Sequence, residues 1–147
     1  MTTPDREYEV VANSRGPRRE FKITVGLREG YDPEGRAYDI SEATKIALRW
    51  MTDRAASGRP FLSGMFTRGE VAYAWPRQDG TAGRDREPVA IFTGEVIPLY
   101  AGGLDDATVE ALLNELAGLL GAALLQERIY IAYREATWIV KRKGSPE

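Results

Sequence analysis

The pattern of apolar and polar positions marks several strands. Over residues 21–27, apolar side chains at every second position alternate with small or polar ones, which is the period of a half-buried strand. Similar patterns predict strands over residues 128–133 and 137–140, and an interrupted strand over residues 89–100. Residues 8–12 are β-prone and precede the turn-rich residues 13–17, so residues 1–19 predict either a hairpin strand that pairs with the first strand or an N-terminal arm.

Two other segments repeat apolar side chains every three or four residues, as amphipathic helices do. The first helix is predicted to follow Asp39, because Asp39 and Glu42 have the spacing of a capping box, and to end at Gly58. The second is predicted to begin at residues 104–106 and to end near Gly121. The apolar stripes are Ala43, Ile46, Ala47, Trp50 and Met51 in the first helix and Val109, Leu112, Leu113, Leu116, Leu119 and Leu120 in the second.

The middle of the chain is the least regular part. Residues 61–66 and 70–75 flank a turn-like Thr-Arg-Gly sequence and predict a hairpin, in which Gly69 takes a positive φ. Residues 76–88 are polar, contain glycine and are bounded by prolines. They therefore predict a mobile loop.

In chain order, these elements predict a single α+β domain over residues 20–143, followed by a frayed tail at residues 144–147. The simplest packing places two helices on one face of a mainly antiparallel sheet, in a ferredoxin-like βαββαβ order with extra strands. The opposite face carries too many large apolar side chains to be left in water. The sequence therefore predicts self-association through that face, into a homo-oligomer.

The chain has 147 residues and contains neither cysteine nor histidine. Disulfides, thiol nucleophiles, Cys/His zinc sites and serine–histidine dyads are therefore excluded. An enzyme built from this sequence needs a carboxylate or tyrosine base, and Glu70 and Glu95 are carboxylates inside predicted strands. The loop at residues 28–39 is acidic, but its proline and glycines fit turns better than a cation site, so no metal and no cofactor are expected.

The charge balance argues against duplex nucleic acid as a partner, and the hydropathy argues against a membrane. With 20 basic and 22 acidic residues, the net charge is -2, without the basic excess of duplex-binding proteins. No apolar run approaches the roughly 18 residues of a membrane span, and the polar N-terminus does not resemble a signal peptide. The sequence thus predicts a cytoplasmic protein with neither a duplex nucleic acid nor a membrane as its partner.

Aromatic side chains and arginines recur together in the predicted strands. Flat rings beside guanidinium groups suit a planar, anionic, nucleotide-like ligand, through stacking and charge-assisted hydrogen bonds. The same residue types are common in cores and subunit interfaces, which is the competing interpretation. Alternation predicts that Arg128, Tyr130 and Arg134 share one face. The candidate ligand-binding residues are Arg128, Tyr130, Arg134, Trp75 and Arg68.

In the second half of the chain, a predicted strand and a leucine-rich predicted helix precede the Glu-Arg-Ile-Tyr-Ile-Ala-Tyr sequence at residues 127–133. This arrangement resembles one βαβ unit of the tautomerase superfamily and covers under half of the chain. The family's catalytic base is a proline exposed at the N-terminus after removal of methionine. Here Thr2 occupies that position, so the resemblance implies no site residue and no activity.

Three hypotheses for function follow. The first is a non-enzymatic, oligomeric protein that binds a small, anionic, planar ligand at or near a subunit interface. The second is a cofactor-independent enzyme of isomerase, tautomerase or monooxygenase type. The third is a phage- or plasmid-type inhibitor or adaptor that acts through protein–protein contact.

Overall fold

The computed structural model describes residues 7–30 and 32–145; residues 1–6 of the predicted arm and 146–147 of the predicted tail lie outside this range. The elements are β1 (Glu20–Gly26), α1 (Ile40–Ala56), β2 (Met65–Pro76), β3 (Ala82–Glu95), α2 (Pro98–Ala101), α3 (Asp106–Ala123), β4 (Arg128–Tyr133) and β5 (Ala136–Lys141). The sheet has the order β2-β3-β1-β4-β5, and all neighbouring strands are antiparallel. Without β5 this is the ferredoxin-like order, so the predicted α+β class is confirmed.

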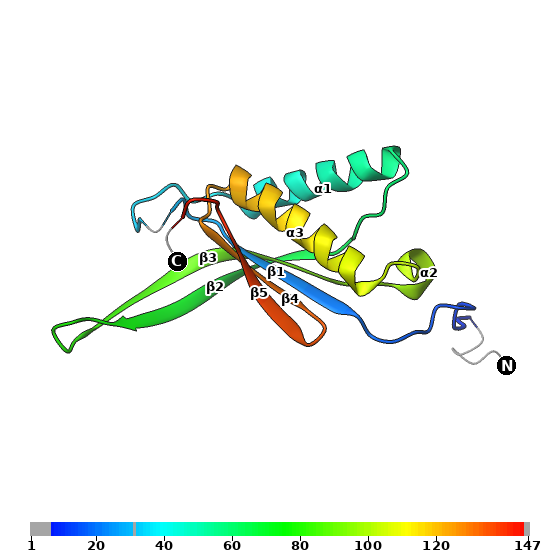
Figure 1. Ribbon diagram of the computed structural model, residues 1–147, viewed down its shortest axis with the longest axis horizontal. Coiled ribbons are helices and arrows are strands. Elements are labelled where there is room, and N and C mark those ends of the chain that lie inside the picture. The colour runs from blue at the N-terminus through cyan, green and yellow to red at the C-terminus, as the bar shows by residue number, and fades with distance from the viewer. Residues whose placement is uncertain (1–6, 31, 146–147) are drawn as a thin grey trace.

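The hydrophobic core lies between the sheet and its helices. α1 and α3 cover the same face of the sheet (Figure 1). Alternate residues of β1, β3 and β4 point into this layer, together with the apolar stripes of the two helices. The largest fully buried side chains are Phe21, Ile23, Val25, Leu27, Phe92, Val109, Leu113, Leu116, Leu120 and Leu124. Full burial stabilises the fold by about 1.5–3 kcal/mol for each side chain of this size.

Both long helices begin where the sequence predicts. The Asp39 carboxylate accepts the Ser41 N–H at 3.0 Å, and the Glu42 carboxylate accepts the Asp39 N–H at 3.0 Å, which completes the capping box. Gly58 follows the end of α1 with a φ of 70°, as a left-handed C-terminal glycine does. Asp105 caps α3 with its own carboxylate. Within the described residues, no helix is both long and apolar enough to span a membrane.

The hairpin predicted within residues 61–75 is wrong. β2 is one continuous strand that runs through Gly69 opposite Val89 of β3 without turning. Pairing with β3 at 12 positions outweighs the local turn preference of residues 67–69. Gly69 instead makes room for a neighbour, because a Cβ added there would lie 2.8 Å from Cδ1 of Ile91.

The loop predicted over residues 76–88 is also wrong as secondary structure. Most of this segment pairs with β2, and the connecting turn covers only the few residues between the two strands. Asp79 shapes the turn by accepting the Thr81 N–H at 2.9 Å, and Gly80 takes a φ of 86°. The sequence missed this hairpin because its second strand, over residues 82–88, is polar and carries no clear alternation.

The strand predicted over residues 89–100 is the second half of β3, which ends at Glu95. Pro98 and Tyr100 belong instead to the short helix α2, and Pro98 is its first residue. Proline suits that position because the first helical N–H has no partner within the helix.

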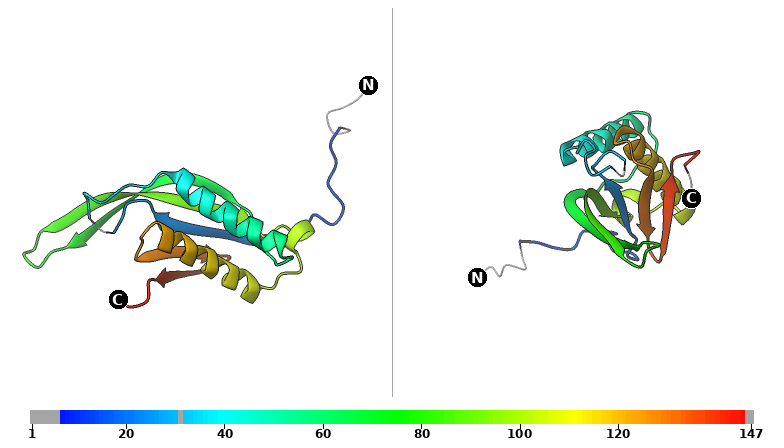
Figure 2. Two further views of the ribbon diagram at one scale, coloured as in Figure 1. Left: turned by 90° about the horizontal axis from the view of Figure 1, so that it is seen from above. Right: turned by 90° about the vertical axis from the view of Figure 1, so that its left-hand side faces the viewer.

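β2 and β3 form a long hairpin whose distal half extends beyond the rest of the fold, as the view from above makes clear (Figure 2). This distal half, residues 70–87, is called the hairpin arm below. Most of its residues are exposed. The structure therefore presents both faces of a two-stranded ribbon to solvent, next to the open face of the sheet.

Residues 7–19 form neither a helix nor a strand and run away from the sheet (Figure 1). This segment is fastened at Arg19. The Arg19 guanidinium donates to Tyr133 Oη at 2.9 Å and to Asp106 Oδ1 at 3.0 Å, at the N-terminus of α3. The hydrogen bond from Tyr133 and the Arg19 guanidinium lower the pKa of Asp106, so this carboxylate stays charged.

Candidate ligand-binding site

The candidate site lies on the face of the sheet that turns away from the helices. Because successive strand residues point to opposite faces, the buried Ile23 faces the helices, whereas Thr24 and Gly26 do not. Thr24 lies opposite Tyr130 of β4, and Gly26 lies opposite Val89 of β3. These residues therefore belong to one open surface.

A hollow of about 420 Å³ opens on this surface, and it is called the central hollow below. It exists because Gly26 has no side chain: a Cβ added there would collide with Oε1 of Glu87 and Oε1 of Gln126. The remaining lining residues are Thr24, Gly30, Val71, Tyr73, Val89, Glu127, Arg128 and Tyr130. A hollow of this size accommodates a small-molecule ligand.

Gln126 presents a fixed acceptor to the central hollow. Its side chain is almost fully buried, and its Nε2 donates to the backbone oxygens of Arg28, at 2.7 Å, and Leu124, at 2.9 Å. Because both amide hydrogens are used by carbonyl groups, the orientation of the amide is fixed, with Oε1 over Gly26. Within the described part of the chain, no hydrogen bond reaches Oε1 of Gln126 or the Glu87 carboxylate.

Glu87 is the half-buried carboxylate of the site. Burial raises its pKa, the Arg28 guanidinium opposes that shift, and the neighbouring Asp85 adds to it. A carboxylate withdrawn from water in this way accepts hydrogen bonds strongly when it is ionised. It also accepts a proton more readily than an exposed glutamate does.

Arg28 ties the loop after β1 to the strand that carries Glu87. Its guanidinium donates to Asp85 Oδ2 at 3.3 Å and to the backbone oxygen of Arg86 at 3.2 Å. The Arg28 side chain is only 16% exposed. These contacts hold this part of the hairpin arm in place beside the central hollow.

Two tyrosines give the central hollow its aromatic surface. Tyr73 comes from the hairpin arm and Tyr130 from β4. Tyr73 packs against Trp75, with ring centroids 5.7 Å apart and planes inclined by 30°. Burial raises the pKa of Tyr73, and the nearby Asp85 carboxylate adds to that shift, so the hydroxyl stays protonated at neutral pH. Flat rings of this kind suit stacking on a planar ligand.

The central hollow brings together two of the five residues that the sequence proposed for ligand binding, Arg128 and Tyr130. Trp75 shares their face of the sheet but lies further along the hairpin arm and does not line the hollow. Arg68 pairs with the buried Ala90 in the ladder, so it points to the opposite face.

The prediction that Arg134 shares a face with Arg128 and Tyr130 is wrong. β4 ends at Tyr133, and Arg134 takes a φ of 53° in the turn to β5, so strand alternation does not extend to it. Its guanidinium pairs with Asp106 at 3.1 Å, near the end of β4 opposite to Arg128.

The two carboxylates proposed from the sequence as possible bases lie elsewhere. Glu70 points to the other face of the hairpin arm and pairs with Arg86 at 3.8 Å. Glu95 is exposed at the end of β3 and pairs with Arg18 at 3.1 Å. Neither of them lines the central hollow, whereas Glu87 does. The described residues hold no group of three acidic side chains arranged for a metal ion.

The sequence analysis missed Gly26, Tyr73, Glu87 and Gln126. Tyr73 lies in the strand predicted over residues 70–75 and shares a face with Trp75 by alternation, so the pattern itself carried the signal that could have found it. An isolated glycine inside a clear strand is a sequence signal of close approach, and Gly26 carries that signal. Nothing in the pattern around Gln126 singles it out.

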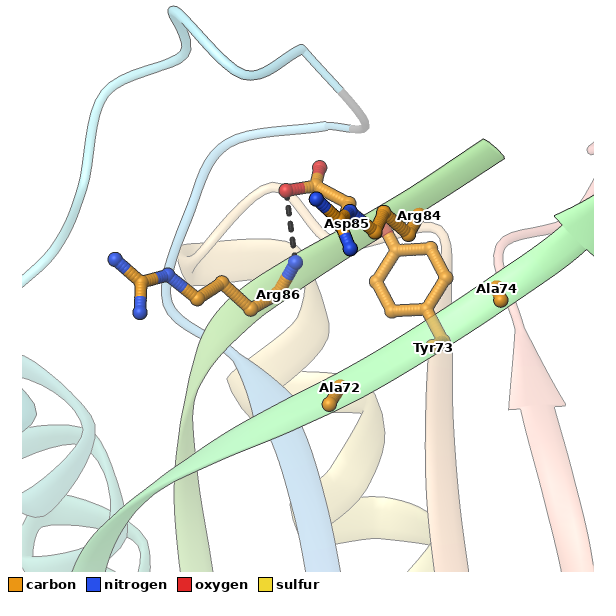
Figure 3. A pocket seen from close by; sticks show the side chains of 6 residues that line it. All are labelled: Ala72, Tyr73, Ala74, Arg84, Asp85 and Arg86. Atoms are coloured by element: carbon orange, nitrogen blue, oxygen red, sulfur yellow. Dashed lines mark hydrogen bonds between the residues drawn. The ribbon is translucent and has the colours of Figure 1, made fainter. Parts of the chain in front are cut away.

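A different hollow of about 600 Å³ lies on the hairpin arm itself (Figure 3). It is lined by Ala72, Tyr73, Ala74, Arg84, Asp85 and Arg86. Figure 3 shows the small side chains of Ala72 and Ala74 and the Asp85 carboxylate accepting the Arg86 N–H, at 2.8 Å. Five of the six lining residues, all except Asp85, are exposed, so this surface encloses a ligand less well than the central hollow.

Fold and site together define an α+β protein with a ligand-sized hollow on the open face of a ferredoxin-like sheet. No protein-family model matches the sequence, and no curated protein matches it either. Among solved structures, a phage SAM lyase in complex with S-methyl-5'-thioadenosine is similar, with a TM-score of 0.60 and 14% identity over 94% of this chain and 100% of that chain. A phage SAM lyase in the apo state gives a TM-score of 0.59 and 15% identity over the same shares. At these identities, the likeness shows a shared fold.

Proposed function

We propose that the protein binds a small adenine nucleoside of the 5'-thioadenosine type in the central hollow. The observation that carries this proposal is the pair of acceptor oxygens, one from Glu87 and one from Gln126, that converge over Gly26. The bound S-methyl-5'-thioadenosine (MTA) of the structurally similar phage SAM lyase supports the same ligand class.

The chemistry of the lining selects the nucleoside over its phosphates. Two acceptors need donors from the ligand, and the ribose hydroxyls and the adenine amino group are donors. A phosphate offers only acceptors at neutral pH and is repelled by the Glu87 carboxylate. Tyr73 and Tyr130 supply surfaces for stacking of the adenine ring. The anionic ligand expected from the sequence therefore fits this hollow less well than a neutral or cationic nucleoside.

Binding is tested by calorimetric titration of MTA into the wild type and into Glu87→Gln and Glu70→Gln. Glu87→Gln is expected to lower the affinity about tenfold, because a charged acceptor becomes a neutral one. Affinity is also expected to fall on acidification at a higher pH than an ordinary glutamate would give, because protonation removes the acceptor charge and burial raises the pKa of Glu87.

Glu70→Gln is the matched control, since Glu70 lies on the opposite face of the same arm. Equal losses of affinity for MTA in Glu87→Gln and Glu70→Gln, or no binding of MTA to the wild type, would contradict the proposal.

Self-association belongs to the same proposal. Large apolar side chains remain exposed on the open face around the central hollow: Met65, Val71, Tyr73, Trp75, Tyr130 and Ile139. Covering them with a second copy removes this surface from water and encloses the ligand. Light scattering at micromolar concentration is expected to give more than the 16.3 kDa of one chain. A monomeric mass at that concentration would contradict this part of the proposal.

A second candidate is a lyase that acts on S-adenosylmethionine (SAM), and the half-buried Glu87 carboxylate favours it. In such a reaction the bond between sulfur and the amino-acid chain breaks, the electron pair stays on sulfur, and the amino-acid fragment loses a proton to a base. Glu87 is the carboxylate placed to accept that proton. Incubation with SAM, followed by mass spectrometry, is expected to show MTA, and Glu87→Gln is expected to slow its formation by about 100-fold. Absence of MTA leaves the binding proposal standing and excludes the lyase.

A further inference from the structure

A second hollow, of about 560 Å³, adjoins the central hollow on the open face. The two share Thr24 and Tyr130 in their linings, so Tyr130 stands between them. The remaining lining of the second hollow is Lys22, Ile131, Ala132, Thr137, Trp138 and Ile139. One ligand can therefore extend from the first hollow into the second.

The register of the strands explains the second hollow. Lys22 of β1, Ala132 of β4 and Thr137 of β5 form one row across the sheet. Ala132 is the small residue in the middle of this row. In the next row, the larger Tyr130 and Ile139 lie opposite each other and bound the hollow on one side.

The second hollow differs from the first in charge. Its ionisable side chain is Lys22, flanked by the hydroxyls of Thr24 and Thr137. Lys22 forms no hydrogen bond or ion pair with any described residue. The nearest acidic side chain on the same strand and face, Glu20, is engaged by Arg18 at 2.7 Å. The ammonium charge of Lys22 is therefore available to a ligand.

The opposite cross-strand neighbour of Lys22 is Thr93 of β3, which carries no charge. Glu95, one row further along β3, is paired with Arg18. No unpaired carboxylate therefore competes for Lys22 from the neighbouring strands that the structure describes.

We propose that the second hollow is a subsite for an anionic group carried on the 5' side of the nucleoside, with Lys22 as its cationic partner and Thr24 and Thr137 as hydroxyl donors. The inference rests on nucleoside binding in the central hollow, where the acceptor oxygens of Glu87 and Gln126 favour hydrogen-bond donors of the ligand over an anionic group. Together the hollows select a ligand with donors at one end and a negative charge at the other. A carboxylate on an amino-acid substituent and a 5'-phosphate both have this chemistry.

The test compares three ligands on the full chain: MTA without an anionic group, SAM with a carboxylate, and adenosine 5'-monophosphate with a phosphate. Lys22→Gln is expected to weaken binding of at least one anionic ligand about tenfold while MTA changes by less than about twofold. Lys45→Gln, on the exposed side of α1, is the matched control and is expected to change none of the three. The ligand that responds identifies the anion.

A second variant fills the hollow rather than removing its charge. Ala132→Leu is expected to lower the affinity for the same anionic ligand and to leave the affinity for MTA unchanged, and thermal melting checks that each variant is folded.

If MTA binds but neither anionic ligand binds, the subsite is wrong and the nucleoside site stands. The same conclusion follows if Lys22→Gln leaves the ratio of the anionic-ligand affinity to the MTA affinity unchanged. If MTA itself fails to bind the wild type, the nucleoside site and the subsite are both wrong.

Discussion

Replacing Gly26 by alanine is expected to lower the affinity for MTA by about thirtyfold or more. The new methyl group would occupy the point on which Glu87 Oε1 and Gln126 Oε1 converge, so both acceptors must turn away. Two lost hydrogen bonds at about 1 kcal/mol each correspond to about thirtyfold in affinity. The backbone of Gly26 does not have a positive φ, so alanine fits the strand without backbone strain.

The matched control is Gly118→Ala, the same substitution on the exposed side of α3, where a Cβ meets nothing within 4 Å. This control is expected to bind MTA normally and to be more stable, by about 0.5–1 kcal/mol, because alanine favours a helix over glycine. Calorimetric titration measures the affinities, and urea denaturation shows that both variants are folded. Unchanged affinity in Gly26→Ala would place the ligand elsewhere.

Replacing Phe92 by alanine is expected to destabilise the protein by about 3–5 kcal/mol. Phe92 is fully buried in the second half of β3. Its ring centroid lies 5.6 Å from that of Phe21 and 4.9 Å from that of Phe66, so truncation removes contacts on both sides and leaves a cavity. A loss of this size is a large part of the total stability of an ordinary domain.

Urea denaturation monitored by tryptophan fluorescence measures this loss, at one protein concentration because self-association changes apparent stability. Tyr100→Ala is the control, since the Tyr100 side chain is 82% exposed, and its effect is expected to stay within about 0.5 kcal/mol. Comparable losses in the two variants would show that the core does not lie where the structure places it.

The elements that could be predicted from the sequence are those with a local signal. α1 carries its own capping box at Asp39 and its own C-terminal glycine, and β1 and β4 carry a clear alternation. Each of these signals acts within a few residues, so neighbouring segments do not change it. The α+β class and the placement of both long helices on one face follow from these elements alone.

The hairpin arm could not be predicted in the same way. Gly69 and residues 76–88 have the composition of turns, and the pairing of β2 with β3 overrides that preference. Both faces of this ribbon are exposed, so burial does not impose an alternation of apolar and polar residues, and in residues 82–88 the usual strand signal is missing. The same misassignment removed Glu87 from consideration as a site residue.

The central hollow depends on residues far apart in the chain. Gly26, Glu87 and Gln126 meet only because β1 lies between β3 and β4 in the sheet, with the observed register. Arg128 and Tyr130 could be predicted because they share one strand. Arg134 could not be placed, because the end of that strand decides where its side chain points.

A crystal structure of the protein with bound MTA tests the central claim most directly. The account predicts that the nucleoside lies on the open face of the sheet, in contact with Tyr73 and Tyr130. Its hydroxyl or amino groups are expected within hydrogen-bond distance of Glu87 and Gln126, over Gly26. Density for the ligand on the hairpin-arm hollow beside Ala72, or anywhere on the helical face, would contradict the account.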